Sequence, residues 1–194
     1  MESNIRKDEG SLKVGDRITV EIGPVAHGGH FIARHKGQVV FVRYGITGEE
    51  AVVEITSTSS KLARGDAIEI LKPSKDRVVP PCKYAVPGGC GGCDFQHIEI
   101  SAQLELKRSV IREQFSRLGR IEMDLDVLPA EPINGLHWRT RMDFAISKNG
   151  KPGLYSARSK EVTEIDKCLI AVEAINDPAM FARSWKGDDR LEVA

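Results

Sequence analysis

Four cysteines constrain this chain more than any other feature. Three of them fall within the Gly-rich segment CKYAVPGGCGGC (82–93), and the fourth, Cys168, lies far downstream. The polar N-terminus MESNIRKDEG does not read as a secretory signal, so we expect an intracellular, cytoplasmic and reducing setting. In such a setting clustered cysteines serve as metal ligands more often than as disulfides. The fold must therefore bring a tight loop to a distant thiol.

The cysteine spacing favours an iron–sulfur cluster over zinc. Cys82 is followed by seven residues, then Cys90, two residues and Cys93, so only one Cys-x2-Cys pair exists. Zinc ribbons supply two such pairs, whereas an arrangement of three clustered cysteines and a remote one is typical of [4Fe–4S] ligation. Glycines beside the cysteines let the backbone bend tightly around a cluster. We predict a [4Fe–4S] cofactor. Its ligands are Cys82, Cys90, Cys93 and Cys168.

Other roles for the cysteines remain open at this point. Cys168 precedes the apolar run LIAV, so a buried filler is a fair interpretation for that residue alone. A redox dithiol of Cys90 and Cys93 lacks the βαβ context that such motifs have. A structural four-cysteine zinc site is the main alternative.

The first part of the chain predicts a small β-barrel. Short runs rich in valine and isoleucine alternate with turn residues, and no helical period appears before residue 73. We expect an all-β, OB-like antiparallel barrel over 11–72, after a flexible lead-in at 1–10. Prolines then mark 73–98 as a linker that carries the cysteine loop. The expected strands are 17–22, 30–35, 37–42, 51–56 and 67–71.

The remainder, 99–194, predicts an α+β domain. Apolar spacing indicates a helix over 101–119 with Ser101 as its N-cap, and period-two alternation indicates a strand over 137–146. Asn149-Gly150 predicts a hairpin. Further strands are expected at GLYSAR and EVTEID, and a helix in one or two pieces at CLIAVEAINDPAMFARSW. The final RLEVA resembles the opening of a strand, so we expect a truncated chain.

Charge and hydropathy exclude some partners and suggest others. The net charge is zero, and no run of about 18 apolar residues could span a membrane, so no membrane partner is expected. The charge is uneven, because 139–160 holds six basic residues against one acid, whereas 161–194 holds four against eight. A local basic surface of this kind fits RNA.

Basic and aromatic side chains form two candidate RNA-binding groups. One group lies on the predicted barrel, where cations would neutralise phosphates and rings would stack on bases. It comprises Phe31, Arg34, Lys36 and Arg43, with His35 and Tyr44 beside them. The other comprises Arg139 and Arg141 on one strand face, with Arg158 and Lys160 across the hairpin. Ordinary pairing of these arginines with nearby carboxylates is the structural alternative.

Several motifs together resemble one enzyme family. They are CGGCDFQH (90–97) leading into SAQLELKR, HWRTRMDFAI (137–146), GLYSARSKEVTEIDKCLI (153–170) and the barrel run at 25–55. The chain resembles the S-adenosylmethionine-dependent RNA uracil-5 methyltransferases that carry an N-terminal TRAM domain, over nearly all of its length after residue 10. The gap between Cys82 and Cys90 is longer than in that family.

The resemblance implies RNA recognition and cluster binding for this chain. It implies a monomeric enzyme that methylates uridine in 23S rRNA, or alternatively in tRNA. Four cysteines engaged as ligands leave no thiolate to attack uracil, and no Gly-rich loop for S-adenosylmethionine is visible. We therefore expect the Rossmann-like catalytic domain, with its cofactor and all catalytic residues, to be absent from this chain.

Three other functions are alternatives to this one. A non-catalytic TRAM module with zinc would bind RNA without chemistry. A radical-SAM methylthiotransferase also joins TRAM to iron–sulfur chemistry, but its Cys-x3-Cys-x2-Cys spacing is not seen here. A protein-interaction domain with incidental cysteines is the third.

Overall fold

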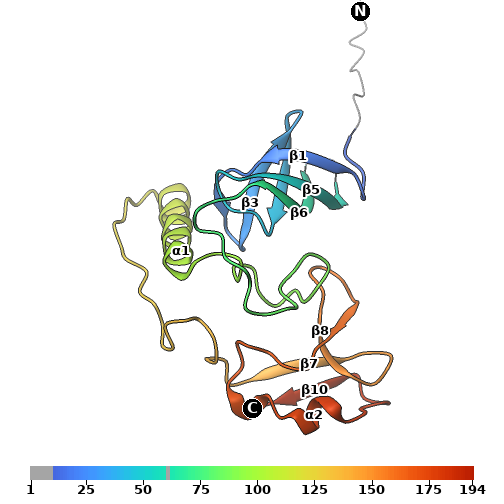
Figure 1. Cartoon of the computed structure of the whole chain (residues 1–194). Coiled ribbons are helices and arrows are strands. Elements are labelled where there is room, and N and C mark those ends of the chain that lie inside the picture. Colours follow the sequence, from blue (N-terminus) through green and yellow to red (C-terminus); the bar gives the residue numbers. More distant parts are fainter. Residues whose placement is uncertain (1–10, 60–61) are drawn as a thin grey trace, which may run out of the picture.

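The computed structural model describes residues 11–59 and 62–194, so the predicted lead-in at 1–10 lies outside the described residues. A β-barrel forms the upper part of the molecule in Figure 1, and a smaller sheet forms the lower part. The segment between β6 and α1 runs between these two parts, and helix α1 stands beside the barrel.

Six strands make the barrel. The sheet order is β1-β5-β6-β4-β3-β2. The Gly23 amide donates to the Ile32 carbonyl at 2.8 Å, so the chain that follows β1 pairs with β3 and closes the sheet. The strands are β1 (Arg17–Glu21), β2 (Val25–Ala26), β3 (His30–His35), β4 (Gln38–Arg43), β5 (Glu50–Thr58) and β6 (Leu62–Lys72).

The prediction of a barrel is confirmed, but the prediction that all its strands are antiparallel is wrong for one pair. β4 and β6 run parallel, with Val40 opposite Ala63. After β4 the chain crosses to β5 and returns as β6, and the β5–β6 hairpin therefore brings β6 back in the direction of β4. Alternate side chains of every long strand fill the interior. Phe31, Val40, Val42 and Val53 are fully buried there.

A buried ion pair fastens the linker to the barrel. Both carboxylate oxygens of Glu49 accept hydrogen bonds at 2.6 Å from the Arg77 guanidinium. The Ser74 and Ile46 amides each donate to Glu49 at 2.9 Å, and Arg77 also donates to the Tyr44 carbonyl at 2.7 Å. Burial raises the pKa of Glu49, but these hydrogen bonds outweigh it and leave the pKa below its ordinary value.

Glu49→Gln should therefore destabilise the chain by about 3 kcal/mol, because it leaves the Arg77 guanidinium without its bidentate partner. Urea unfolding at pH 7 measures the difference. The control is Glu54→Gln, which removes an exposed pair with Arg17 and should cost under about 1 kcal/mol. Equal losses in the two variants would contradict the role given to Glu49.

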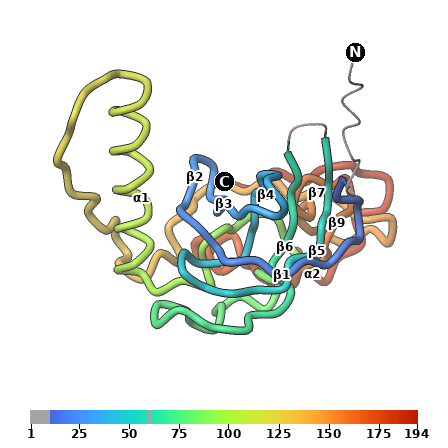
Figure 2. The backbone as a smooth tube through the Cα atoms, turned by 90° about the horizontal axis from the view of Figure 1, so that it is seen from above, coloured from blue at the N-terminus to red at the C-terminus, as the bar shows by residue number. Residues whose placement is uncertain are grey.

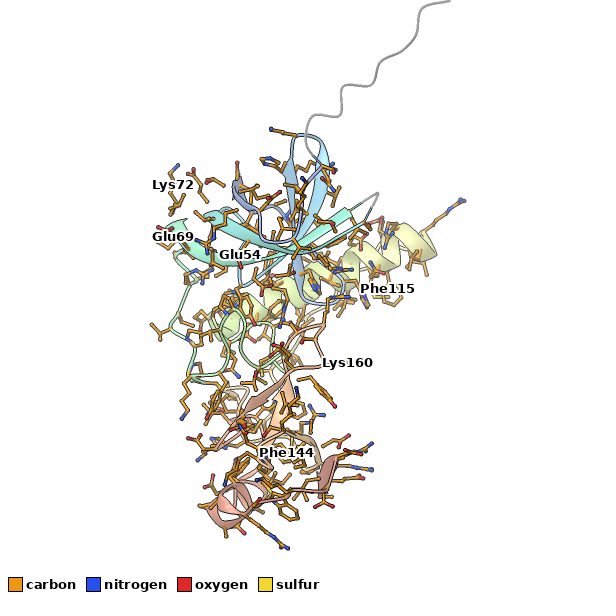
Figure 3. The ribbon with its side chains drawn as sticks, turned by 90° about the vertical axis from the view of Figure 1, so that its right-hand side faces the viewer. Glu54, Glu69, Lys72, Phe115, Phe144 and Lys160 are labelled. Atoms are coloured by element: carbon orange, nitrogen blue, oxygen red, sulfur yellow. The ribbon has the colours of Figure 1, made fainter. Side chains whose placement is uncertain are left out.

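The second part combines one helix with a four-stranded sheet of order β10-β7-β8-β9. α1 (Ile100–Gln114) continues into the π-helical turn η1 (Phe115–Gly119). The strands are β7 (Met142–Ile146), β8 (Pro152–Tyr155), β9 (Val162–Glu164) and β10 (Arg190–Val193), and two short helices are η2 (Glu173–Ile175) and α2 (Pro178–Ala182). Phe144, labelled in the lower sheet of Figure 3, packs edge-on against Phe181 of α2 with ring centroids 5.6 Å apart.

The predictions for this part are largely confirmed, with two corrections. Glu99 rather than Ser101 caps α1, since its carboxylate accepts from the Ser101 amide at 2.7 Å. The predicted strand at 137–146 begins only at Met142, and Trp138 is 52% exposed. The helix expected in one or two pieces after Cys168 is present as two short helices, η2 and α2, the second capped by Asp177. The hairpin at Asn149-Gly150 and the final strand, β10, are present.

Candidate metal centre and nucleic-acid interface

All four cysteines line one cavity of about 80 Å³, although they come from distant parts of the sequence. Cys82, Cys90 and Cys93 lie on the loop between the barrel and α1, and Cys168 follows β9. Within the described ranges, no group of three or more histidine, cysteine, aspartate or glutamate side chains is arranged as it stands to hold a metal ion. The four thiols nonetheless share one largely apolar chamber, in which Met142, Leu154 and Ile165 are neighbours.

The cysteine loop is fixed by backbone contacts with β8 and the residue after it. Cys90 forms a β-bridge with Ser156, and the Gly91 amide donates to the Tyr155 carbonyl at 2.9 Å. A Cβ at Gly91 would lie 2.7 Å from the Ala157 amide nitrogen, which is closer than real Cβ contacts come. Only glycine permits this approach.

Gly91→Ala should destabilise the chain by about 2 kcal/mol or more, because the loop must withdraw from β8. Gly92→Ala is the matched control from the same motif. Its Cβ would meet the Cys90 sulfur at 3.4 Å and Leu154 at 3.6 Å, both ordinary contacts. Thermal unfolding of the two variants should separate them, and an equal loss would show that close approach is not what Gly91 provides.

Burial disfavours the thiolate form of three of these cysteines. It raises the pKa of Cys93 to about 11 and also raises the pKa values of Cys90 and Cys168, and neighbouring thiols add to each effect. Arg139 lines the same cavity, and its positive charge acts to lower the pKa of Cys168. Since metals bind thiolates, loading this site would release protons.

Gln96 was not singled out as a site residue from the sequence, yet it connects two of the cysteines. Its amide nitrogen donates to the Cys93 sulfur at 3.1 Å, and its amide oxygen accepts from the Cys82 amide at 3.2 Å. Asn176 plays a similar part on the other side, exchanging hydrogen bonds with the Cys168 backbone at 2.8 and 3.0 Å. The signal for Gln96 was its position three residues after Cys93.

His97 joins the cysteine segment to the barrel. The ring is 3% exposed, and its Nε2 lies 3.1 Å from the Gly45 carbonyl, to which the neutral imidazole donates. Burial lowers the pKa of His97 to about 4.

Because the folded pKa lies below the unfolded value of about 6.5, the stabilisation is complete above pH 6.5 and is lost as the pH falls toward 4. His97→Gln should flatten this part of the stability profile, since the amide can still donate but does not titrate. Urea unfolding between pH 7 and pH 5 measures it. The exposed His27→Gln serves as control and should keep the wild-type slope, and the same slope in both variants would rule out His97 as the source.

The barrel residues proposed for RNA binding do not form one open face. Phe31 is fully buried, because its strand position points into the core, so its ring cannot stack on a base. Tyr44 is also buried, and Arg43 is paired with Asp94 at 3.0 Å. Arg34 and Lys36 are exposed at the end of the β3–β4 hairpin.

The second predicted RNA-binding group, which comprises Arg139, Arg141, Arg158 and Lys160, does not form one surface either. Arg141 pairs with Glu192 of β10, as expected if this arginine pairs with a nearby carboxylate and not with RNA. Arg139 donates to the Arg141 carbonyl at 3.1 Å and faces the cysteine cavity. Arg158, in the turn between β8 and β9, lies against the barrel, where it lines a cavity with Arg43 and with Arg64, a residue that sequence reasoning missed. Lys160 of the same turn is labelled in Figure 3.

Comparison with known proteins shows that this chain contains a TRAM domain and is similar to RNA methyltransferases. The TRAM domain family matches residues 11–68. An uncharacterised RNA methyltransferase of Streptomyces coelicolor is 45% identical over 93% of this chain and 42% of its own length. One from Streptomyces avermitilis is 43% identical over 93% of this chain and 45% of its own length. The chain thus spans less than half the length of these relatives.

A solved structure is also similar. The tRNA (uracil-54, C5)-methyltransferase of Pyrococcus abyssi, in complex with S-adenosyl-L-homocysteine, superposes with a TM-score of 0.53 at 25% identity. The match covers 81% of this chain and 34% of that one. In the part of the chain that the structure describes, no helix is both long and apolar enough to cross a membrane.

Proposed function

We propose that this chain, a member of the TRAM-containing RNA uracil-C5 methyltransferase family, forms the RNA-recognition and [4Fe–4S]-binding portion of an enzyme that methylates uridine with S-adenosylmethionine. One observation carries the proposal. Cysteines from two distant segments line a single cavity in a chain that also carries a TRAM domain.

The donor set of that cavity fits an iron–sulfur cluster. All four candidate ligands are cysteines, and soft thiolate donors of this kind are the usual ligands of [4Fe–4S] clusters. A single zinc ion would need four sulfurs within about 4 Å of one another, since each Zn–S bond is about 2.3 Å long. A [4Fe–4S] cluster is larger than a zinc ion, so the sulfurs of its four cysteine ligands lie farther apart. Cys82, Cys90, Cys93 and Cys168 would hold it.

The cluster's proposed role is structural. Cys168 lies in the core of the second part, with Phe144 and Ile170. Metal ligation would therefore tie the loop at 82–93 to that core and couple cluster binding to folding. No catalytic thiolate is assigned to this chain, because the four cysteines would all be engaged as ligands. No S-adenosylmethionine site is assigned either, because no Gly-rich loop that would hold it is visible in the sequence.

The RNA target follows from the family and not from any one residue. Methylation of 23S rRNA remains our prediction, with tRNA, which the Pyrococcus abyssi enzyme's name specifies, as the alternative. A monomer acting in the cytoplasm is part of the same proposal.

Anaerobic purification followed by iron and sulfide analysis tests the metal centre. We expect about four irons and four sulfides per chain, with a broad visible absorption band. Cys90→Ser, Cys93→Ser and Cys168→Ser should each lower the iron content severalfold, and Cys82→Ser should do the same if the expanded loop ligates. Val86→Ser, an exposed position in the same loop, is the control and should retain full iron.

Two results would overturn the cluster. Stoichiometric zinc without sulfide would instead support an RNA-binding module with a zinc site. A folded chain that binds neither metal, even after reconstitution with iron and sulfide, would leave the cysteines as buried fillers.

A further inference from the structure

A polar cavity of about 100 Å³ lies where the barrel meets the β8–β9 turn. Three arginines line it, two from the barrel and one from the second part of the chain. They are Arg43 of β4, Arg64 of β6 and Arg158 of the turn. Figure 2, viewed from above, shows β4 and β6 of the barrel overlying the strands of the second sheet.

Two of these arginines lack a carboxylate partner. Neither Arg64 nor Arg158 forms an ion pair with any residue in 11–59 or 62–194. They are also close enough to repel each other, since burial and the charge of Arg158 together lower the pKa of Arg64. An anion between them would relieve this repulsion.

The Arg64 side chain is held in place by an aromatic ring. The Arg64 guanidinium lies over the ring of Phe41, 5.2 Å from its centroid, and His30 packs edge-on against the same ring. Arg158 has a left-handed backbone with φ of 53°, which a non-glycine residue adopts at some cost. The Arg64 guanidinium is thus oriented in advance, which lowers the entropic cost of binding a ligand.

Arg43 supplies an unsatisfied donor at the same place. Its side chain is only 8% exposed, and one end of the guanidinium donates to Asp94 at 3.0 Å. The other end, Nη1, is buried without a hydrogen-bond partner among the described residues. Buried charged donors left unpaired are uncommon and call for an explanation. A ligand oxygen in the cavity, reached by a small shift of the guanidinium, would complete this donor.

The remaining residues that line the cavity indicate which kind of anion it would bind. Asp66 is the one carboxylate among those named for this cavity, and burial raises its pKa, so it opposes an anion less than an exposed aspartate would. Thr56 and Ser57 add hydroxyl groups. Three guanidinium groups and two hydroxyls around a small polar cavity match the size, charge and acceptor oxygens of a phosphate group.

We propose that this cavity binds one phosphate of an RNA backbone. The inference rests on the proposed function, because it takes RNA as the source of that phosphate. A phosphate held here would touch the TRAM barrel and the second part at once, and would fix the RNA across the junction between them. Arg34 and Lys36, at the far end of a hairpin, do not line this cavity.

The first test is RNA binding by the 194-residue chain, measured by fluorescence anisotropy with a single-stranded oligonucleotide at several salt concentrations. Arg64→Gln and Arg158→Gln should each weaken binding about tenfold, uniformly across sequences, and lower the slope of log K against log salt by about 0.7. Arg117→Gln is the matched control. It removes the same charge from an exposed helical pair with Glu113 and should change affinity less than about twofold.

The second test uses inorganic phosphate as the probe and does not depend on RNA. Side-chain Nε–H signals of Arg64 and Arg158 should shift on adding phosphate, and should not shift with chloride at equal ionic strength. RNA binding that is equally strong in all variants, with no phosphate-induced shifts, would overturn this site and leave the proposed function intact. Shifts with phosphate in a chain that binds no RNA would support the anion site but overturn both its RNA assignment and the proposed function.

Discussion

The buried Glu49–Arg77 pair determines where everything after the barrel lies. Glu49 sits in the loop that leads into β5, is fully inaccessible, and accepts four hydrogen bonds, two of them from Arg77. A buried carboxylate is tolerated only when it is paired and fully hydrogen-bonded. The arrangement therefore specifies one position of the linker relative to the barrel. His97, which contacts the Gly45 carbonyl from the other end of the cysteine segment, fixes the same segment at a second point.

Between these two anchors the chain forms the cysteine loop, and the loop's shape follows from them. Its ends are held at Arg77 and His97, and its centre is bridged to Ser156 and Tyr155. Gln96 then sets the relative positions of Cys82 and Cys93. The four thiols consequently line one cavity.

Much of the fold could be predicted from sequence because its signals are local. Alternation in the barrel strands, the Asn149-Gly150 turn and the apolar stripe of α1 each concern neighbouring residues. The parallel β4–β6 pairing could not be read this way, because it depends on how a closed sheet returns on itself. The cysteine cavity was predictable since four identical, chemically distinctive residues mark it. The role of Arg64 was not predictable, because nothing in the sequence of its strand indicates that the β8–β9 turn brings Arg158 to the same cavity.

The two cavities are mechanically linked through a few residues of the cysteine motif. Cys90 is bridged to Ser156, and Gly91 packs against Ala157, so the loop holds the turn that presents Arg158. Asp94, next to Cys93, pairs with Arg43 on the barrel side. A cluster that stiffens this loop would thereby fix the positions of Arg43 and Arg158, which line the second cavity, although it would contact neither of them. Under the proposed function, a structural iron–sulfur centre would influence RNA recognition through the positions of Arg43 and Arg158, and not through electron transfer.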